Sequence, residues 1–253
     1  MRNDVWIKRS GQDAQTSFRL FCFPFAGGGA SFYRTWPERL RPDIEICAIQ
    51  LPGREERLAE TPFDRLASLV DVLVDVLYPY MDFPFAFFGH SLGSLISFEL
   101  TRRLRRQKAP CPLQLFVSGS RAPQIPDPDP PIHQLPDAEF IAALRRFNGT
   151  PSAVLDNPEL MELFLPLLRS DIRLYETYLY DHEDPLDCPI SAFGGLEDKE
   201  VSSEELAAWR DQTRKRFRMQ IFPGDHFFLN GQASNGLLEA ISGDIKKITC
   251  ETK

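Results

Sequence analysis

Short runs of apolar, β-branched and aromatic residues alternate with longer segments of helical periodicity along most of the chain. Strands that alternate with helices form βαβ units, and these build a mostly parallel sheet with helices on both faces. The sequence therefore predicts an α/β fold, and 253 residues suit a single domain, 1–253. The predicted strands are 18–25, 44–51, 83–88, 113–120, 189–195 and 216–224, and the predicted helices between or after them are 31–40, 63–80, 92–107, 202–213 and 234–248.

The segment 121–184 breaks this alternation. It opens with "RAPQIPDPDPPIHQLP", where the prolines prevent regular structure, and it continues with helical patterns at about 137–147 and 158–180. Connections within a sheet domain usually take only a few residues, and insertions as long as this one often cover a functional site. We therefore expect 121–184 to be a helical lid inserted between two strands. A helical subdomain without a role at the site is the alternative.

The predicted strand 83–88 runs into the motif G-H-S-L-G (89–93), and a helical pattern begins at once. A G-x-S-x-G motif between a strand and a helix is typical of a nucleophile elbow, in which the serine occupies a sharp, strained turn. Glycines on both sides remove the Cβ atoms that would clash where strand and helix cross. The motif predicts that Ser91 is a nucleophile at the carboxyl end of the sheet. A helix-capping serine would explain Ser91 but not both glycines.

A serine nucleophile needs a base, and the base needs an acidic group that orients it. With this elbow the order along the chain is serine, acid, histidine. His226 directly follows the last predicted strand, so we expect it to be the base. Asp198 lies just past the strand 189–195 and is the preferred acid, ahead of its neighbour Glu197. The remaining histidines are His90, His133 and His182, and the other nearby carboxylates are Glu200 and Asp225.

Acyl transfer to a serine also requires two preorganised N–H groups that hold the oxyanion. One belongs to the residue after the nucleophile, which is Leu92. The other belongs to the loop after the first strong strand, "FPFAGGG", where we expect Ala26 to provide it, with Phe25 as the next candidate. A phosphate-binding loop is disfavoured, because "AGGGAS" lacks both the G-K-[ST] ending and the G-x-G-x-x-G spacing.

Charge, hydrophobicity and cysteine content exclude several classes of function. A formal net charge of −7 argues against nucleic acid as the main partner, since phosphate binding needs a basic face. The sequence has no stretch that reads as a signal peptide and no apolar run of roughly 18 residues, so we expect no membrane contact. Five scattered cysteines without a CxxC pair predict reduced thiols in a cytoplasmic protein, and four histidines without ligand spacing predict no metal site. Nothing demands more than a monomer, which is the state we expect.

Six segments together resemble the free-standing type II thioesterases of polyketide synthase and nonribosomal peptide synthetase pathways. They are "FCFPFAGGGASFY", "LPGREER", "FAFFGHSLG", "VSGSRAP", "GGLEDKEV" and "FPGDHFFL", in the family's order over roughly 18–245. The resemblance implies an α/β-hydrolase fold with a mobile helical lid. It also places Ser91, Asp198 and His226 on the family's triad positions, and Ala26 and Leu92 on its oxyanion-hole positions.

The resemblance further implies a substrate, an acyl group on the 4′-phosphopantetheine arm of an acyl or peptidyl carrier protein domain, and an editing role. No cofactor is implied, because the phosphopantetheine belongs to the substrate. Of the phenylalanines near the site, we expect Phe25 and Phe227 to line an acyl pocket, while core packing explains most of the group. The arginines at the end of the helix 92–107 form either a docking site for an acidic carrier protein or an ordinary solvated face.

Three other functions remain open at this point. A medium-chain fatty acyl thioesterase and a small-molecule carboxylesterase would use the same three residues. The non-enzymatic alternative is a catalytically dead α/β-hydrolase-like binding module, which the intact set of Ser91, Asp198 and His226 disfavours.

Overall fold

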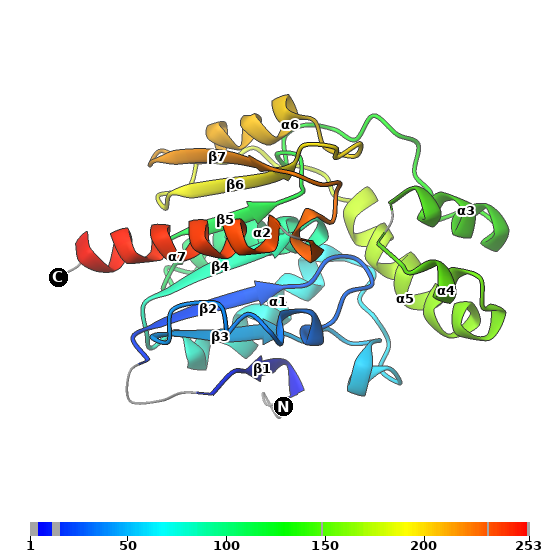
Figure 1. Cartoon of the computed structure of the whole chain (residues 1–253), viewed down its shortest axis with the longest axis horizontal. Helices are drawn as coiled ribbons and strands as arrows, with labels where there is room; N and C mark the ends of the chain where they lie inside the picture. Colours follow the sequence, from blue (N-terminus) through cyan, green and yellow to red (C-terminus); the bar gives the residue numbers. More distant parts are fainter. Residues whose placement is uncertain (1–4, 12–15, 148, 232, 252–253) are drawn as a thin grey trace.

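The computed structural model describes residues 5–11, 16–147, 149–231 and 233–251. Within these residues, seven strands form one sheet in the order β1-β3-β2-β4-β5-β6-β7 (Figure 1). β1 pairs antiparallel with β3, and all other neighbours are parallel. The strands are β1 (Ile7–Arg9), β2 (Phe18–Phe23), β3 (Ile44–Ile49), β4 (Phe85–His90), β5 (Leu115–Ser118), β6 (Ile190–Gly195) and β7 (Phe217–Phe222).

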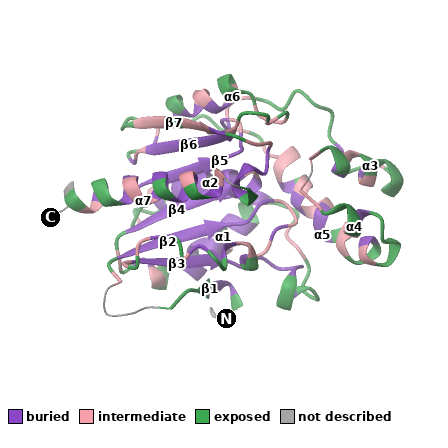
Figure 2. Cartoon of the chain, viewed as in Figure 1, coloured by how far each residue is buried: buried purple, intermediate pink, exposed green. Residues whose placement is uncertain are grey.

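The central strands are buried along their whole length, as Figure 2 shows. This is the reason that they read as nearly continuous apolar runs rather than as an alternating pattern. Successive side chains point to opposite faces of the sheet. In β2, for example, Phe21 and Phe23 belong to one apolar cluster, whereas Leu20 and Cys22 belong to the other.

Helices cover both faces of the sheet (Figure 1). The cluster on one face includes residues of α1 (Leu66–Leu77), α2 (Leu92–Arg106) and α6 (Ser203–Ala207), together with Trp209 of the 3₁₀ turn η5 (Ala208–Gln212). The cluster on the other face includes residues of α7 (Ala233–Glu251) and of the 3₁₀ turn η2 (Ala30–Tyr33). This is the layered α/β architecture that the alternation predicted.

Three further helices lie between β5 and β6 in the sequence and stand at the carboxyl ends of the strands (Figure 1). They are α3 (Asp137–Phe147), α4 (Ser152–Leu155) and α5 (Pro158–Glu176). We call them, with the described connections in 121–147 and 149–184, the cap. The cap has its own small apolar cluster, which includes Phe140, Leu144 and Met161.

Some predicted elements were wrong in extent or type. The expected helix 31–40 is only the 3₁₀ turn η2 followed by further turns. Pro37 explains this, because it lacks an N–H group and disfavours helical backbone at the residue before it. The expected helix 158–180 ends at Glu176, and the short elements β1 and α4 were missed. Among the described helices, none combines the length and hydrophobicity needed to cross a bilayer.

Candidate active site

Ser91 lies on the turn between β4 and α2, where the motif placed it. Its φ of 51° and ψ of −119° are in a region that non-glycine residues rarely occupy. The backbone is held there because the Ser91 N–H donates a hydrogen bond to the Ser118 carbonyl oxygen at 2.8 Å. A Cβ atom at Gly93 would lie 2.4 Å from the Phe23 carbonyl oxygen, and one at Gly89 would lie 2.1 Å from the Gly93 carbonyl carbon. The glycines therefore permit the close crossing of strand and helix.

His226 and Asp198 follow β7 and β6, and the structure brings them into direct contact. Asp198 Oδ2 is 2.9 Å from His226 Nδ1, and the Asp198 side chain is fully buried. The second carboxylate oxygen accepts hydrogen bonds from the N–H groups of Glu200 and Val201, at 2.8 and 3.2 Å. Asp198 is therefore fixed by its own loop, and it leaves Nε2 of His226 as the ring nitrogen available to a reacting group.

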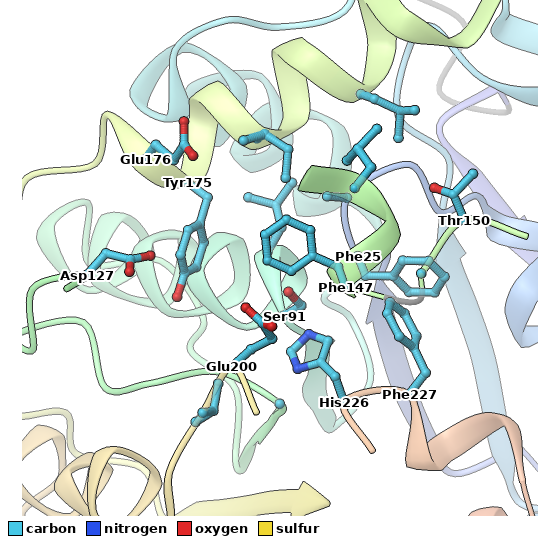
Figure 3. A pocket seen from close by; sticks show the side chains of 18 of the residues that line it. Phe25, Ser91, Asp127, Phe147, Thr150, Tyr175, Glu176, Glu200, His226 and Phe227 are labelled. Atoms are coloured by element: carbon cyan, nitrogen blue, oxygen red, sulfur yellow. The ribbon is translucent and has the colours of Figure 1, made fainter. Parts of the chain in front are cut away.

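Ser91 and His226 point into a common pocket beneath the cap (Figure 3). Ala26, Leu92, Phe25 and Phe227 also line this pocket. Six of the seven residues predicted at the site therefore line one pocket. The seventh, Asp198, does not line it but contacts the Nδ1 side of His226.

The two expected oxyanion-hole residues present backbone N–H groups in suitable settings. Leu92 is the first residue of α2, and the first N–H groups of a helix have no partner within it. Ala26 belongs to a tight turn in which the Gly28 N–H donates to the Phe25 carbonyl oxygen at 2.9 Å. Among the described residues, none accepts a hydrogen bond from the Ala26 N–H. Both groups are therefore available to an oxygen at the Ser91 end of the pocket.

The aromatic residues near the site divide into pocket and core. Phe25 and Phe227 line the pocket and pack edge to face, with ring centroids 5.0 Å apart. The remaining phenylalanines of this group belong to the two apolar clusters of the sheet and are Phe23, Phe87, Phe88 and Phe228.

The other histidines have structural settings. His90 is fully buried behind the elbow, where its Nδ1 lies 3.0 Å from the Ser118 hydroxyl and burial lowers its pKa well below the usual value. His133 lies in the cap, with Nδ1 2.6 Å from Glu176. The His182 ring packs edge to face against Tyr180. Of the four, His226 is the one that lines the pocket with Ser91.

The cap supplies a wall of the pocket that the sequence reasoning missed. Leu168, Ile172, Tyr175 and Glu176 of α5 face it, and their spacing of four, three and one along the helix marks a single face. This periodicity was readable in the sequence, but it did not reveal that the face looks toward Ser91. The other cap residues that line the pocket are Arg121, Asp127, Leu144, Phe147, Gly149 and Thr150.

The arginines at the end of α2 form ion pairs with neighbouring carboxylates. Arg103 pairs with Asp71 at 2.7 Å, and Arg105 pairs with Glu183 at 2.8 Å. Arg102 and Arg106 also contact Glu183. Burial alone would raise the pKa of Glu183, but hydrogen bonds from Arg106 and Arg105 outweigh this and lower the pKa to about 2. The network joins α2 to the segment before β6, which favours a structural role for this basic run.

Within the described residues, no group of three or more histidine, cysteine, aspartate or glutamate side chains is arranged to hold a metal ion.

Comparison with known proteins identifies the family. A thioesterase domain model matches residues 18–247. The gramicidin S biosynthesis protein GrsT of Aneurinibacillus migulanus is 46% identical over 224 residues, which cover 88% of each chain. Among solved structures, the thioesterase RedJ from the prodiginine pathway of Streptomyces coelicolor is 38% identical, with a TM-score of 0.85 over 90% of both chains. BorB, the type II thioesterase of the borrelidin biosynthetic cluster, is 36% identical, with a TM-score of 0.84 over 98% of this chain and 99% of BorB.

These similarities extend over nearly the whole chain, and they confirm the expected α/β-hydrolase fold. The chain belongs to the thioesterase family, has type II thioesterases of nonribosomal peptide and polyketide pathways among its close relatives, and is a thioester hydrolase.

Proposed function

We propose that this thioesterase removes acyl groups from the 4′-phosphopantetheine arm of carrier protein domains in a polyketide or nonribosomal peptide pathway, and so clears stalled assembly lines. The observation that carries the proposal is the strained Ser91 in one pocket with a His226 that Asp198 orients at 2.9 Å. The type II thioesterases among the relatives support the carrier-bound substrate and do not favour a fatty acyl thioesterase or a carboxylesterase.

The proposed reaction proceeds through an acyl-enzyme. Nε2 of His226 takes the proton of the Ser91 hydroxyl as the serine oxygen attacks the thioester carbonyl carbon. The N–H groups of Leu92 and Ala26 hold the oxyanion of the tetrahedral intermediate. Its collapse breaks the carbon–sulfur bond, and the pantetheine thiolate, whose parent thiol has a pKa near ~8.5, leaves readily and takes the proton that His226 held. The neutral His226 then takes a proton from water as the water oxygen attacks the Ser91 ester, and it returns that proton to the Ser91 oxygen as the acid leaves.

Each proposed step uses groups of this chain and of the substrate. Asp198 keeps His226 in the required tautomer and stabilises the imidazolium while it holds the proton. Phe25 and Phe227, with the cap residues of the pocket wall, would receive the apolar part of the acyl group.

The test is hydrolysis of matched acyl groups, from acetyl to decanoyl, presented on a phosphopantetheinylated carrier protein and as simple oxygen esters. We expect the carrier thioesters to be cleaved much faster. Ser91→Ala should abolish turnover, and Asp198→Asn should lower kcat by about 10³- to 10⁴-fold with the fold intact, because the amide favours the wrong tautomer of His226. Preferred cleavage of oxygen esters, or turnover by Ser91→Ala, would contradict the proposal.

A further inference from the structure

The cap contacts the segment after β3 through a buried ion pair. Asp171 of α5 receives two parallel hydrogen bonds from the guanidinium group of Arg54, at 2.8 and 2.9 Å. The side chains of Asp171 and Arg54 are only 1% and 4% exposed. Such a two-pronged pair is geometrically specific as well as strong. The pair is therefore a fixed point between α5 and the segment that follows β3.

Both partners also bind the loop that contains Ala26. Asp171 Oδ2 accepts a hydrogen bond from the Gly27 N–H at 2.7 Å. Arg54 Nη1 donates to the Gly28 carbonyl oxygen at 2.9 Å. Together with the bond from the Gly28 N–H to the Phe25 carbonyl oxygen, these contacts hold the turn on several sides, while no described residue accepts from the Ala26 N–H.

The turn has a conformation that Asp171 selects. Residues 25–28 close with a hydrogen bond between the first and fourth residues, and Gly27 in third position has a φ of +77°. A positive φ at that position defines a type II turn and favours glycine. In the alternative type I turn the peptide between Ala26 and Gly27 is flipped, which would turn the carbonyl oxygen of Ala26 toward the Asp171 carboxylate. Repulsion between the two oxygens disfavours that state.

Packing reinforces the same contact. Leu168 lies three residues before Asp171, on the same face of α5. A Cβ atom at Gly27 would lie 2.7 Å from the Leu168 side chain, so the helix rests directly on the turn.

We propose that Asp171, held and neutralised by Arg54, is a positioning residue that fixes the turn presenting the Ala26 N–H to the oxyanion. The cap thereby sets the geometry of the oxyanion hole as well as lining the acyl pocket. Arg54 also balances a negative charge that would otherwise oppose the developing oxyanion. This inference rests on the proposed function, in which Ala26 and Leu92 stabilise the tetrahedral intermediate.

The test compares two inhibitors of equal chain length. An alkyl boronic acid forms a tetrahedral adduct with Ser91 and places an oxygen in the oxyanion hole, as a transition-state analogue does. The S-alkyl thioether of pantetheine lacks the thioester carbonyl and so places no oxygen in the oxyanion hole. In Asp171→Asn and Arg54→Lys, we expect boronate affinity to fall about 10- to 100-fold while thioether affinity stays within about twofold, because the donor is misplaced rather than removed.

Glu45→Gln is the matched control. Glu45 is a fully buried carboxylate paired with Arg19 at 2.9 Å, near the amino-terminal ends of β2 and β3 and away from the pocket. The Glu45→Gln substitution should change the free energy of unfolding without changing the ratio of the boronate affinity to the thioether affinity. A further measurement uses the wild type alone and so does not depend on whether the variants fold. The Gly27 amide proton should exchange slowly with solvent, because Asp171 accepts its hydrogen bond.

Equal loss of both affinities, an unchanged boronate affinity, or rapid exchange at Gly27 would overturn the inference. Failure of the proposed function has a different signature. In that case the wild type itself neither hydrolyses thioesters nor forms the boronate adduct at Ser91.

Discussion

Glu200 is an ionisable side chain of the pocket whose charge acts directly on His226. Both point into the pocket beside Ser91 (Figure 3). Burial raises the pKa of Glu200 above its usual value, and the attraction of the His226 imidazolium opposes that rise. An anionic Glu200 also attracts the positive charge that forms on the His226 ring as it takes the Ser91 proton.

Replacing Glu200 with Gln removes this titrating charge from the pocket. We expect kcat/KM of Glu200→Gln to match that of the wild type at acidic pH, where Glu200 is protonated, and to fall below it at higher pH, where Glu200 is ionised. The measurement is kcat/KM for an acyl pantetheine across the acidic and neutral range. Glu204→Gln, at an exposed position of α6, should leave the profile unchanged. Profiles of Glu200→Gln and wild type that coincide over the whole range would show that this charge does not act on the reaction.

The residues of the Ser91 site differ in how far the sequence could predict them. Ser91, Asp198 and His226 each follow a strand, and the carboxyl ends of parallel strands meet at one edge, so their positions could be inferred from local pattern. The contact between Gly27 and Asp171 joins residues 144 positions apart. Nothing local distinguishes Asp171 from other acidic residues of the predicted helices, because its importance comes from the packing of the cap onto the loop.

At the level of elements, the junction of β4 and α2 depends on the absence of side chains at its glycines. A methyl group at Gly93 would meet carbonyl oxygens of Phe23 and Pro24, at 2.4 and 2.9 Å. These are backbone atoms of the central strand β2 and the residue after it, so they cannot move aside at low cost. Gly243 of α7 offers the contrast, because a Cβ atom there would have no neighbour within 4 Å.

We expect Gly93→Ala to lower the free energy of unfolding by about 3 kcal/mol or more, since the helix must shift away from the strand. Gly243→Ala should raise it by about 0.5–1 kcal/mol, because alanine loses less backbone freedom than glycine in a helix. Urea unfolding followed by circular dichroism measures both. Equal effects of the two substitutions would mean that helix propensity, rather than the close crossing, decides the outcome at Gly93.

Helices and strands could be predicted where their buried face leaves a regular apolar pattern in the sequence. The helix over Leu66–Leu77 and the six longer strands have strong patterns, and the structure has them close to the predicted bounds. The helix predicted over 31–40 was wrong. The aromatic residues of this segment pack into the core from a series of turns, and their spacing resembles that of a helix. β1 could not be seen because three residues carry no usable period.

On the scale of the whole molecule, the sheet and the cap rest on different apolar clusters. Phe98 of α2 is 1% exposed in a large cluster that reaches from α1 through the sheet to Trp209. Phe140 of α3 is fully buried in the small cap cluster. α5 connects the two, because Leu168 belongs to the cap cluster and Leu174 to the cluster of the sheet. We therefore expect the cap to open locally while the sheet remains folded.

Substitutions in the two clusters should distinguish local opening of the cap from global unfolding of the molecule. Phe98→Ala should lower the free energy of global unfolding by about 3–5 kcal/mol, because the cavity lies in the main core. Phe140→Ala should instead speed amide hydrogen exchange in α3, α4 and the first half of α5, with exchange in β2, β4 and β5 unchanged. Exchange monitored by mass spectrometry, beside urea unfolding, distinguishes the two responses. If Phe140→Ala lowers global stability as much as Phe98→Ala, then cap and sheet unfold as one cooperative unit, and opening of the pocket would require loosening the sheet as well.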